Sequence, residues 1–321
     1  MKKVLAIDGG GIRGLIPALL LEHLEEEAGQ PVSQLFDLVA GTSTGGILAL
    51  GLVTPWEDGT PRYTAGELAD LYRTEGSRIF HRSFGYWLRS AGNLADAKYP
   101  PKGIEEVLDR YFGESRLSEA LTPVVVTSYE IERRVPWFFK SRKASDPELA
   151  GEYDFPMKKV GRATSAAPTY FDPLRLDAPE DETDYYALVD GGVYANNPAM
   201  CAWAEAQVMW PGEDILLVSL GTGKLTRRIA LQKAERWGVA GWATPILDVV
   251  FDGVADTIDF QLRQVLPENR YYRYQVRLNE GNEGMDNTRK ANLRELQLLA
   301  EGLIGERRQE LNNLAGRLVA G

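Results

Sequence analysis

The chain has 321 residues, of which 44% are hydrophobic, 26% charged and 10% aromatic, so it can bury a large core without covalent staples. Thirty-six Lys and Arg against 46 Asp and Glu give a net charge of −10, which argues against a nucleic-acid wrapper with a net basic face. A single cysteine, Cys201, excludes an intrachain disulfide and fits a reducing compartment. The apolar run near the start is too short for an export signal, and no stretch approaches the ~18 apolar residues that span a bilayer, so we expect a cytoplasmic protein.

The first elements alternate between strands and helices, with glycine turns between them. Residues 4–7 are typical of a short buried parallel strand, and residues 15–28 have the apolar spacing of a helix. A second strand over residues 36–40 leads at once into a glycine turn and a helix over residues 47–52. This repeated order predicts an α/β sheet with its ligand chemistry at the carboxyl ends of the strands.

The rest of the chain shows no repeat, low-complexity tract or linker. We expect an irregular aromatic segment with Phe84, Tyr86 and Trp87 over residues 77–100. The apolar patterns predict strands over 123–131, 135–140, 187–190, 215–220 and 271–278, and helices over 64–76 (with a capping box), 103–112, 198–209, 236–265, 289–304 and 306–319.

A glycine-rich loop, Asp8-Gly-Gly-Gly-Ile-Arg-Gly14, follows the first strand. The spacing of Gly9, Gly11 and Gly14 fits a dinucleotide-binding turn, but the second strand ends without the carboxylate that would hold a ribose. A P-loop would need Gly-Lys-Ser/Thr, which neither this loop nor residues 221–225 supplies. The loop also fits an oxyanion hole, in which backbone N–H groups point at one spot beside a helix N-terminus. Taken alone, it leaves these interpretations open.

A nucleophile motif, Gly41-Thr42-Ser43-Thr44-Gly45, follows the second strand. In a Gly-x-Ser-x-Gly turn between strand and helix, the serine is strained and its neighbours at ±2 must lack side chains. The helix dipole would stabilise negative charge on the serine oxygen. The alternative is that Ser and Thr merely cap a helix after a glycine turn.

A serine nucleophile needs a base, and the chain has only two histidines. His23 lies in a predicted helix beside acidic residues, and His81 has no supporting acid motif, so we interpret both as structural. Asp190 ends an apolar strand and is followed by Gly191 and Gly192, where sheet enzymes place catalytic groups. An aspartate with a pKa near ~3.9 is a poor base at neutral pH, so Asp190 would have to be desolvated or act on a stabilised alkoxide. A simple tight turn is the alternative.

The three motifs, in this order and spacing, resemble the patatin-like phospholipase family. Residues 163–171 (Ala-Thr-Ser-Ala-Ala-Pro-Thr-Tyr-Phe) and Asn196-Asn197-Pro198 resemble further stretches of that family. The resemblance covers about residues 4–202. It implies an α/β three-layer sandwich with a mainly parallel central sheet, in which residues 4–202 form the catalytic core. Residues 203–321 would add C-terminal strands and helices to the same unit.

The resemblance also implies a chemistry, a lipid acyl hydrolase of the phospholipase A or lysophospholipase type that works through an acyl-enzyme. Ser43 would be the nucleophile and Asp190 the general base of a Ser-Asp dyad, with neither a metal nor a cofactor. The oxyanion hole would be formed by the backbone N–H groups of Gly10 and Gly11, with that of Thr44. Arg13 would stabilise the loop or reach a phosphate head group. The glycines that support these motifs would be Gly9, Gly14, Gly41, Gly45, Gly191 and Gly192.

Two segments bear on how the protein would meet its membrane lipid. Residues 133–143 combine five basic residues with three aromatics, which would suit anionic head groups or a nucleic acid, although a core strand with solvated charges is the favoured interpretation. Residues 236–265 offer a second apolar surface, for which core burial is again favoured. We expect a membrane lipid as partner and transient, peripheral contact with the membrane, but no nucleic acid. The oligomeric state stays open.

Two other function classes compete with the hydrolase. A non-catalytic or signal-gated lipid-binding effector on the same fold is disfavoured because both dyad residues are present. A nucleotide-binding oxidoreductase is disfavoured by the missing carboxylate on the second strand.

Overall fold

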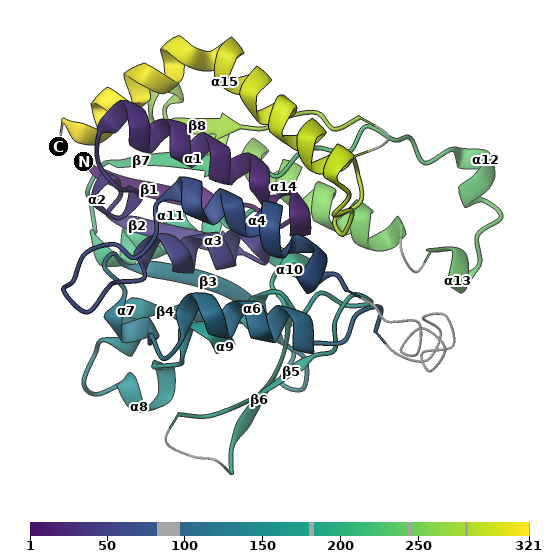
Figure 1. Cartoon of the computed structure of the whole chain (residues 1–321), viewed down its shortest axis with the longest axis horizontal. Coiled ribbons are helices and arrows are strands. Elements are labelled where there is room, and N and C mark those ends of the chain that lie inside the picture. The colour runs from purple at the N-terminus through teal and green to yellow at the C-terminus, as the bar shows by residue number, and fades with distance from the viewer. Residues whose placement is uncertain (82–96, 180–182, 243–244, 280–281, 321) are drawn as a thin grey trace.

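The computed structural model describes residues 1–81, 97–179, 183–242, 245–279 and 282–320, and the expected aromatic segment around Phe84 lies mostly outside them. Figure 1 shows a twisted sheet between two layers of helices, which is the predicted α/β sandwich with a long C-terminal helix. Within the described residues the strands form one sheet in the order β5-β6-β3-β2-β1-β7-β8, with β4 also paired to β3. The strands are β1 (Lys2–Ile7), β2 (Leu38–Thr42), β3 (Val124–Glu130), β4 (Val135–Lys140), β5 (Leu174–Asp177), β6 (Tyr185–Asp190), β7 (Ile215–Leu220) and β8 (Tyr271–Tyr274).

The helices cover both faces of this sheet. The longer ones are α1 (Leu15–Ala28), α3 (Thr44–Val53), α4 (Ala65–Ile79), α6 (Lys102–Phe112), α9 (Met157–Thr164), α11 (Ala199–Met209), α14 (Pro245–Val265) and α15 (Lys290–Val319). The short ones are η1 (Gly11–Gly14), α2 (Val32–Leu35), η2 (Leu117–Glu119), α7 (Ser141–Ala144), α8 (Ala150–Tyr153), α10 (Gly192–Ala195), α12 (Leu231–Ala234), α13 (Val239–Trp242) and η3 (Glu268–Arg270).

The side chains of β1 point alternately to the two faces of the sheet and so belong to two separate hydrophobic clusters. Leu5 and Ile7 are buried in the larger cluster, which α1, α3, α4 and α15 cover. Val4 and Ala6 face the other way, into a smaller cluster with α11 and α14. Successive side chains of a strand point to opposite faces, so a continuous apolar run such as 4–7 needs helices on both sides.

Strands β2 and β6 meet on one edge of β3. Thr127 of β3 is paired with Thr42 of β2 and with Phe138 of β4, so β2 and β4 lie on opposite edges. The next residue of β3, Ser128, is paired with Asp190 and again with β4, so β6 continues along the edge that β2 has left. Because β2 runs parallel and β6 antiparallel to β3, their carboxyl ends meet. This arrangement brings residues 43 and 190 together.

Most predicted elements lie where the sequence places them, with three kinds of difference. The helix over 15–28 and the strand over 215–220 have the predicted bounds. The two C-terminal helices expected on either side of Gly305 are one helix, α15, since its buried side chains pack along α1. The expected strand 271–278 ends at Tyr274, and β5 and α9 were not predicted.

The basic and aromatic stretch 133–143 forms β4 and its flanks. Phe139 is fully buried, and the basic side chains of Lys140 and Arg142 both pair with the buried Glu205. Arg133 pairs with Asp184 at 2.8 Å. The expected core strand is therefore found only in part: among the described strands β4 pairs with β3 alone, and Val135 and Pro136 at its start are exposed. Three of the five basic side chains are paired, whereas Arg134 and Lys143 form no ion pair within the described residues. Among the described helices, none combines the length and the apolar character needed to cross a membrane.

Candidate active site

Ser43 occupies a strained turn between β2 and α3. Its φ of 54° and ψ of −123° lie outside the regions that L-residues ordinarily adopt. The turn is closed by close backbone approaches, because a side chain on Gly41 would collide with the backbone of Gly45, and one on Gly45 with the carbonyl of Ile7. These contacts explain why glycine flanks the serine at both positions.

Thr164, the last residue of α9, supports this turn. Its Oγ1 accepts a hydrogen bond from the Ser43 N–H at 2.8 Å and donates one to the Thr127 carbonyl at 2.7 Å. Thr44 begins α3, and its hydroxyl lies 2.7 Å from the hydroxyl of Tyr72 on α4. The turn is thus held from α9, β3 and α4 at once.

Asp190 faces Ser43 from the end of β6 and is 2% exposed. Burial raises the pKa of its carboxyl from 3.8 to about 7, and hydrogen bonds from the Ser43 side chain and the Gly192 N–H oppose that rise. The Gly192 N–H donates to Oδ1 at 2.7 Å. A side chain on Gly191 would collide with Thr127, which shows how closely this turn packs on β3.

Two carbonyls of the glycine loop are tied back to the protein. The Thr222 hydroxyl donates to the Gly9 carbonyl at 2.6 Å, and the Arg13 Nε–H donates to the Gly10 carbonyl at 3.2 Å. In a planar trans peptide the N–H points opposite to the carbonyl, so these bonds direct the Gly10 and Gly11 N–H groups away from Thr222 and Arg13. Within the described residues, no protein acceptor binds either N–H, and both glycines line the pocket next to Ser43.

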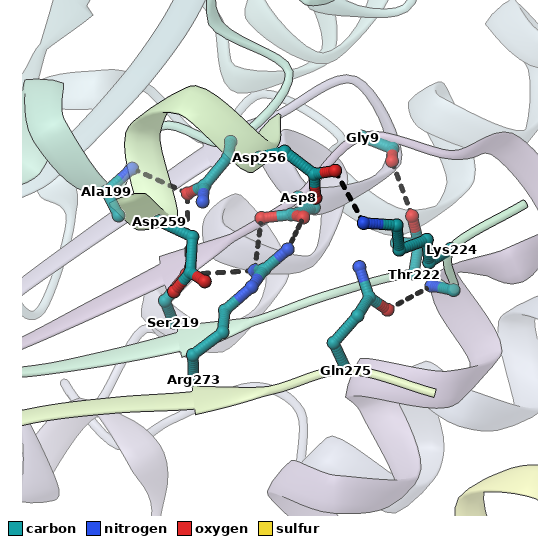
Figure 2. Close-up of polar contacts among 12 residues, drawn as sticks. Asp8, Gly9, Ala199, Ser219, Thr222, Lys224, Asp256, Asp259, Arg273 and Gln275 are labelled. Carbon is teal, nitrogen blue, oxygen red and sulfur yellow. Dashed lines mark hydrogen bonds and ion pairs between the residues drawn. The ribbon is translucent and has the colours of Figure 1, made fainter. Parts of the chain in front are cut away.

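The C-terminal part of the chain fixes the rest of this loop. The Ile12 N–H donates to the Met285 carbonyl at 2.8 Å, and Gly11, with a φ of +60°, lies so close to Met285 that a side chain there would collide with it. Figure 2 shows Asp8 and Arg273 facing each other beneath the loop, where Nη1 lies 2.9 Å from Oδ1. Burial alone would lower the pKa of Arg273, but the Asp8 carboxylate raises it above its ordinary value.

An apolar pocket opens beside Ser43, Asp190 and the glycine loop. Its polar lining includes Ser165, whose hydroxyl has no partner among the described residues, and Asn196, whose carbonyl accepts from the Gly9 N–H at 2.9 Å. The apolar lining comes from segments spread along the chain: Ile12, Ile47, Leu71, Tyr72, Ile79, Phe80, Ile104, Ala167, Tyr170, Phe171, Phe251 and Met285. Such a pocket suits a hydrocarbon chain that ends at the polar groups around Ser43.

The remaining predicted site residues lie around this centre. Arg13 is buried, which lowers the pKa of its guanidinium, and the nearby Asp252 and Asp248 carboxylates oppose that shift. A side chain on Gly14 would collide with Thr44 and Tyr72. Among the described residues, the pocket lining includes neither histidine, and no cluster of three His, Cys, Asp or Glu could hold a metal.

Four contacts that hold this site together are not predicted from the sequence. Thr164 and Asn196 lie in stretches that resemble the family, but the resemblance implies no role for either residue. Thr222 and Met285 lie in the C-terminal third and carry no motif. The only local signal in the sequence is the position of Thr222, which follows the end of β7 at the edge of the sheet where β1 also ends.

Comparisons with known proteins find similarity to one protein family over most of the chain. The family model described as patatin-like phospholipase matches residues 5–203. "Patatin-like protein 2" of Arabidopsis thaliana is 33% identical over 85% of this chain and 75% of its own length. "Probable inactive patatin-3-Kuras 1" of Solanum tuberosum is 32% identical over 86% of this chain and 78% of its own. The crystal structure of VipD from Legionella pneumophila covers 94% of this chain and 67% of that one with 11% identity, but its TM-score of 0.37 is too low to carry an argument.

Proposed function

Because this chain belongs to the patatin-like phospholipase family, we propose that it hydrolyses the acyl esters of membrane lipids through Ser43 and Asp190. One relative carries the words "probable inactive" in its name, so family membership alone does not carry this proposal. The observation that carries it is that the buried Asp190 carboxyl and Ser43 line one pocket, together with two N–H groups that have no protein acceptor among the described residues.

The proposed reaction is a two-step acyl transfer. The Asp190 carboxylate takes the proton of the Ser43 hydroxyl while Oγ attacks the carbonyl carbon of the ester. The Gly10 and Gly11 N–H groups, with that of Thr44 at the start of α3, stabilise the oxyanion that forms. The intermediate then collapses, and the leaving alcohol takes the proton from Asp190. Asp190 next removes a proton from a water molecule, which attacks the acyl-enzyme. As the fatty acid leaves, Asp190 returns that proton to the Ser43 Oγ, and both residues are restored.

The burial of Asp190 suits this role. A carboxylate with a pKa near 4 holds a proton too weakly to assist a serine at neutral pH, whereas one at about 7 matches the working pH. The apolar pocket would hold the acyl chain, so we propose a phospholipase A or lysophospholipase type of activity at the membrane surface.

The test is hydrolysis of a soluble short-chain ester together with labelling by a fluorophosphonate. We expect the probe to label Ser43 alone, and we expect Ser43→Ala to abolish both labelling and turnover. His23→Ala and His81→Ala are the matched controls and should keep turnover within a few-fold of wild type, because losing a general base costs ~10²–10⁴ in rate. Labelling at another serine, or a loss of that size at either histidine, would refute the dyad. A folded protein that is neither labelled nor active would support the non-catalytic effector instead.

A further inference from the structure

Residues 227–242, which contain α12 and α13, form an exposed arm beside the active site. Figure 1 shows these two short helices at the right-hand side, apart from the sheet and its covering layers. Large aliphatic side chains on the arm face solvent: Ile229 is 41% exposed, Leu231 72% and Val239 92%. Trp237 and Trp242 pack edge to face, with ring centroids 5.0 Å apart. The core burial expected for residues 236–265 is therefore wrong for this part, although Phe251 of α14 is buried.

The arm differs in charge from the rest of the chain. It carries four basic residues and one acid, Glu235, a net charge of +3, although the whole chain carries −10. Arg227, at its base, pairs with carboxylates of Asp248 and Glu283. Within the described part of the chain, no carboxylate lies within ion-pair distance of the other three, which are exposed: Arg228, Lys233 and Arg236.

The base of the arm is fixed beside segments that line the pocket. The Arg227 N–H donates to Glu283 at 2.9 Å, two residues before the pocket-lining Met285. On the other side, α13 contacts α14, which contributes Phe251 to the pocket. A surface bound by the arm would therefore lie close to Met285 and Phe251, which line the pocket beside Ser43.

We propose that this arm docks the protein onto the surface of an anionic phospholipid bilayer, an inference that rests on the proposed lipid hydrolase function. Exposed aliphatic side chains and two half-buried Trp side chains, interleaved with cations that have no carboxylate partner among the described residues, suit the boundary between head groups and acyl chains. The negative potential of an anionic leaflet attracts such cations within a Debye length. A protein partner fits less well, because the buried centre of a protein interface is depleted of charged residues.

The test is flotation of the full chain with phosphatidylcholine vesicles, made with and without phosphatidylglycerol. Ser43→Ala serves as the background so that the vesicles stay intact. One variant removes the free charges (R228Q, K233Q and R236Q), and a second removes the exposed aliphatic groups (L231N and V239N). Matched controls change exposed residues elsewhere: R134Q, K159Q and R308Q for the charges, and V208N with L298N for the aliphatic groups.

We expect binding that strengthens with phosphatidylglycerol. Each basic residue at an anionic surface contributes about fivefold to partitioning, so the charge variant should bind about 100-fold more weakly. Each aliphatic group should contribute about tenfold to binding of both vesicle types, and the controls should bind as the background does. Equal binding by the charge variant and its control, or binding insensitive to phosphatidylglycerol, would overturn the inference. The inference would also be overturned if the protein bound no vesicles and light scattering showed a dimer that is lost in the arm variants.

A soluble short-chain ester separates this inference from the proposed function. With Ser43 restored, both arm variants should hydrolyse it at the wild-type rate, because none of the substituted residues lines the pocket. Arm-dependent vesicle binding by a protein that hydrolyses no ester would refute the proposed function and leave the docking inference standing. If instead the protein hydrolyses the ester but its vesicle binding does not change when the arm is altered, the docking inference would be refuted and the proposed function would stand.

Discussion

The Ser43 backbone is held in a conformation that suits glycine better than serine. A φ of 54° with a ψ of −123° costs a non-glycine residue about 1–3 kcal/mol, and it persists because neighbouring contacts hold it. The hydrogen bond to Thr164 and the close packing of Gly41 on Gly45 supply those contacts. The same turn places the Ser43 side chain at the start of α3, in the pocket that Asp190 also lines. The strain thus lies at the residue proposed to react.

We predict that Ser43→Gly is more stable than Ser43→Ala by about 1 kcal/mol or more, because only glycine relieves the strain. Both variants lack the hydroxyl and should be inactive, so the comparison isolates the backbone. Denaturant unfolding of the two proteins measures the difference. If alanine proved as stable as glycine at this position, the turn would not be strained in solution.

Asp190 links activity and stability to pH in opposite directions. Its folded pKa, about 7, lies above the ordinary 3.8. The native state therefore holds this proton where the unfolded chain has lost it, and stability falls as the pH rises from about 4 through 7. The proposed base works only when ionised, so kcat/KM should rise over the same range and level off above it. The rise near neutrality would resemble that of a histidine enzyme, although neither histidine lines the pocket.

We predict that Asp190→Asn lowers kcat by ~10²–10⁴ yet stabilises the fold at alkaline pH. Asparagine keeps an acceptor for the Gly192 N–H but cannot ionise, so the stabilisation relative to wild type should grow by about 2–3 kcal/mol between pH 5 and 8. Unfolding curves at the two pH values, with kinetics at pH 8, test both effects. A fully active variant would refute the dyad, and a gain independent of pH would mean that Asp190 is ionised at pH 5.

At the scale of elements, the end of β7 positions the loop that follows β1. Thr222 holds the Gly9 carbonyl and packs against Gly10, while Arg273 of β8 holds Asp8 from below (Figure 2). Arg273 also donates to Ser219 of β7 at 2.9 Å, so the two C-terminal strands act on the loop together. The proposed oxyanion hole is therefore built on the first strand but oriented by segments more than 200 residues away.

We predict that Thr222→Val lowers kcat by about tenfold or more with little change in KM. Valine keeps the shape of the side chain but cannot donate to the Gly9 carbonyl. The peptide that joins Gly9 to Gly10 would then no longer be held, and the Gly10 N–H on its other side would lose its orientation toward the oxyanion. Thr222→Ser keeps the donor and should restore most of the rate. Steady-state kinetics on a soluble ester, with thermal unfolding as the control for folding, make the test. An equal loss in both variants would assign Thr222 to packing alone.

The elements also show what local sequence can predict. Ser43, Asp190 and the glycine loop lie in short motifs at strand ends, so the roles proposed for them can be predicted from a few neighbouring residues. Thr164 lies in a stretch that resembles the family, and Thr222 lies in no motif. The partners of these two threonines are 121 and 213 residues away, so the local sequence does not indicate what either one holds in place. Gly305 misled the helix prediction for a related reason. Glycine costs a helix interior about 1 kcal/mol, but the packing of α15 along α1 outweighs that local cost.

At the scale of the whole molecule, the pocket is assembled from almost the full length of the chain, from Ile12 to Met285. Helix α4 lines it over two turns, from Leu71 to Ile79. Tyr72 contacts Thr44 beside the proposed nucleophile, and Ile79 lies seven residues further along the same helix, about 10 Å away at 1.5 Å per residue. An acyl chain bound at Ser43 would therefore extend along α4 toward Ile79.

We predict that Ile79→Trp shortens the pocket and shifts the preference of the enzyme toward short acyl chains. The kcat/KM for a decanoyl ester should fall by about tenfold or more, while that for a butyryl ester should stay within a few-fold, because only the longer chain reaches Ile79. Phe80→Ala, which enlarges the same end, should leave the decanoyl ester at least as good a substrate as before. A series of esters of increasing length measures both variants, and the short ester reports whether each one is folded and active. Equal losses on all chain lengths would place the acyl chain elsewhere, and the pocket would then have to serve another part of the lipid.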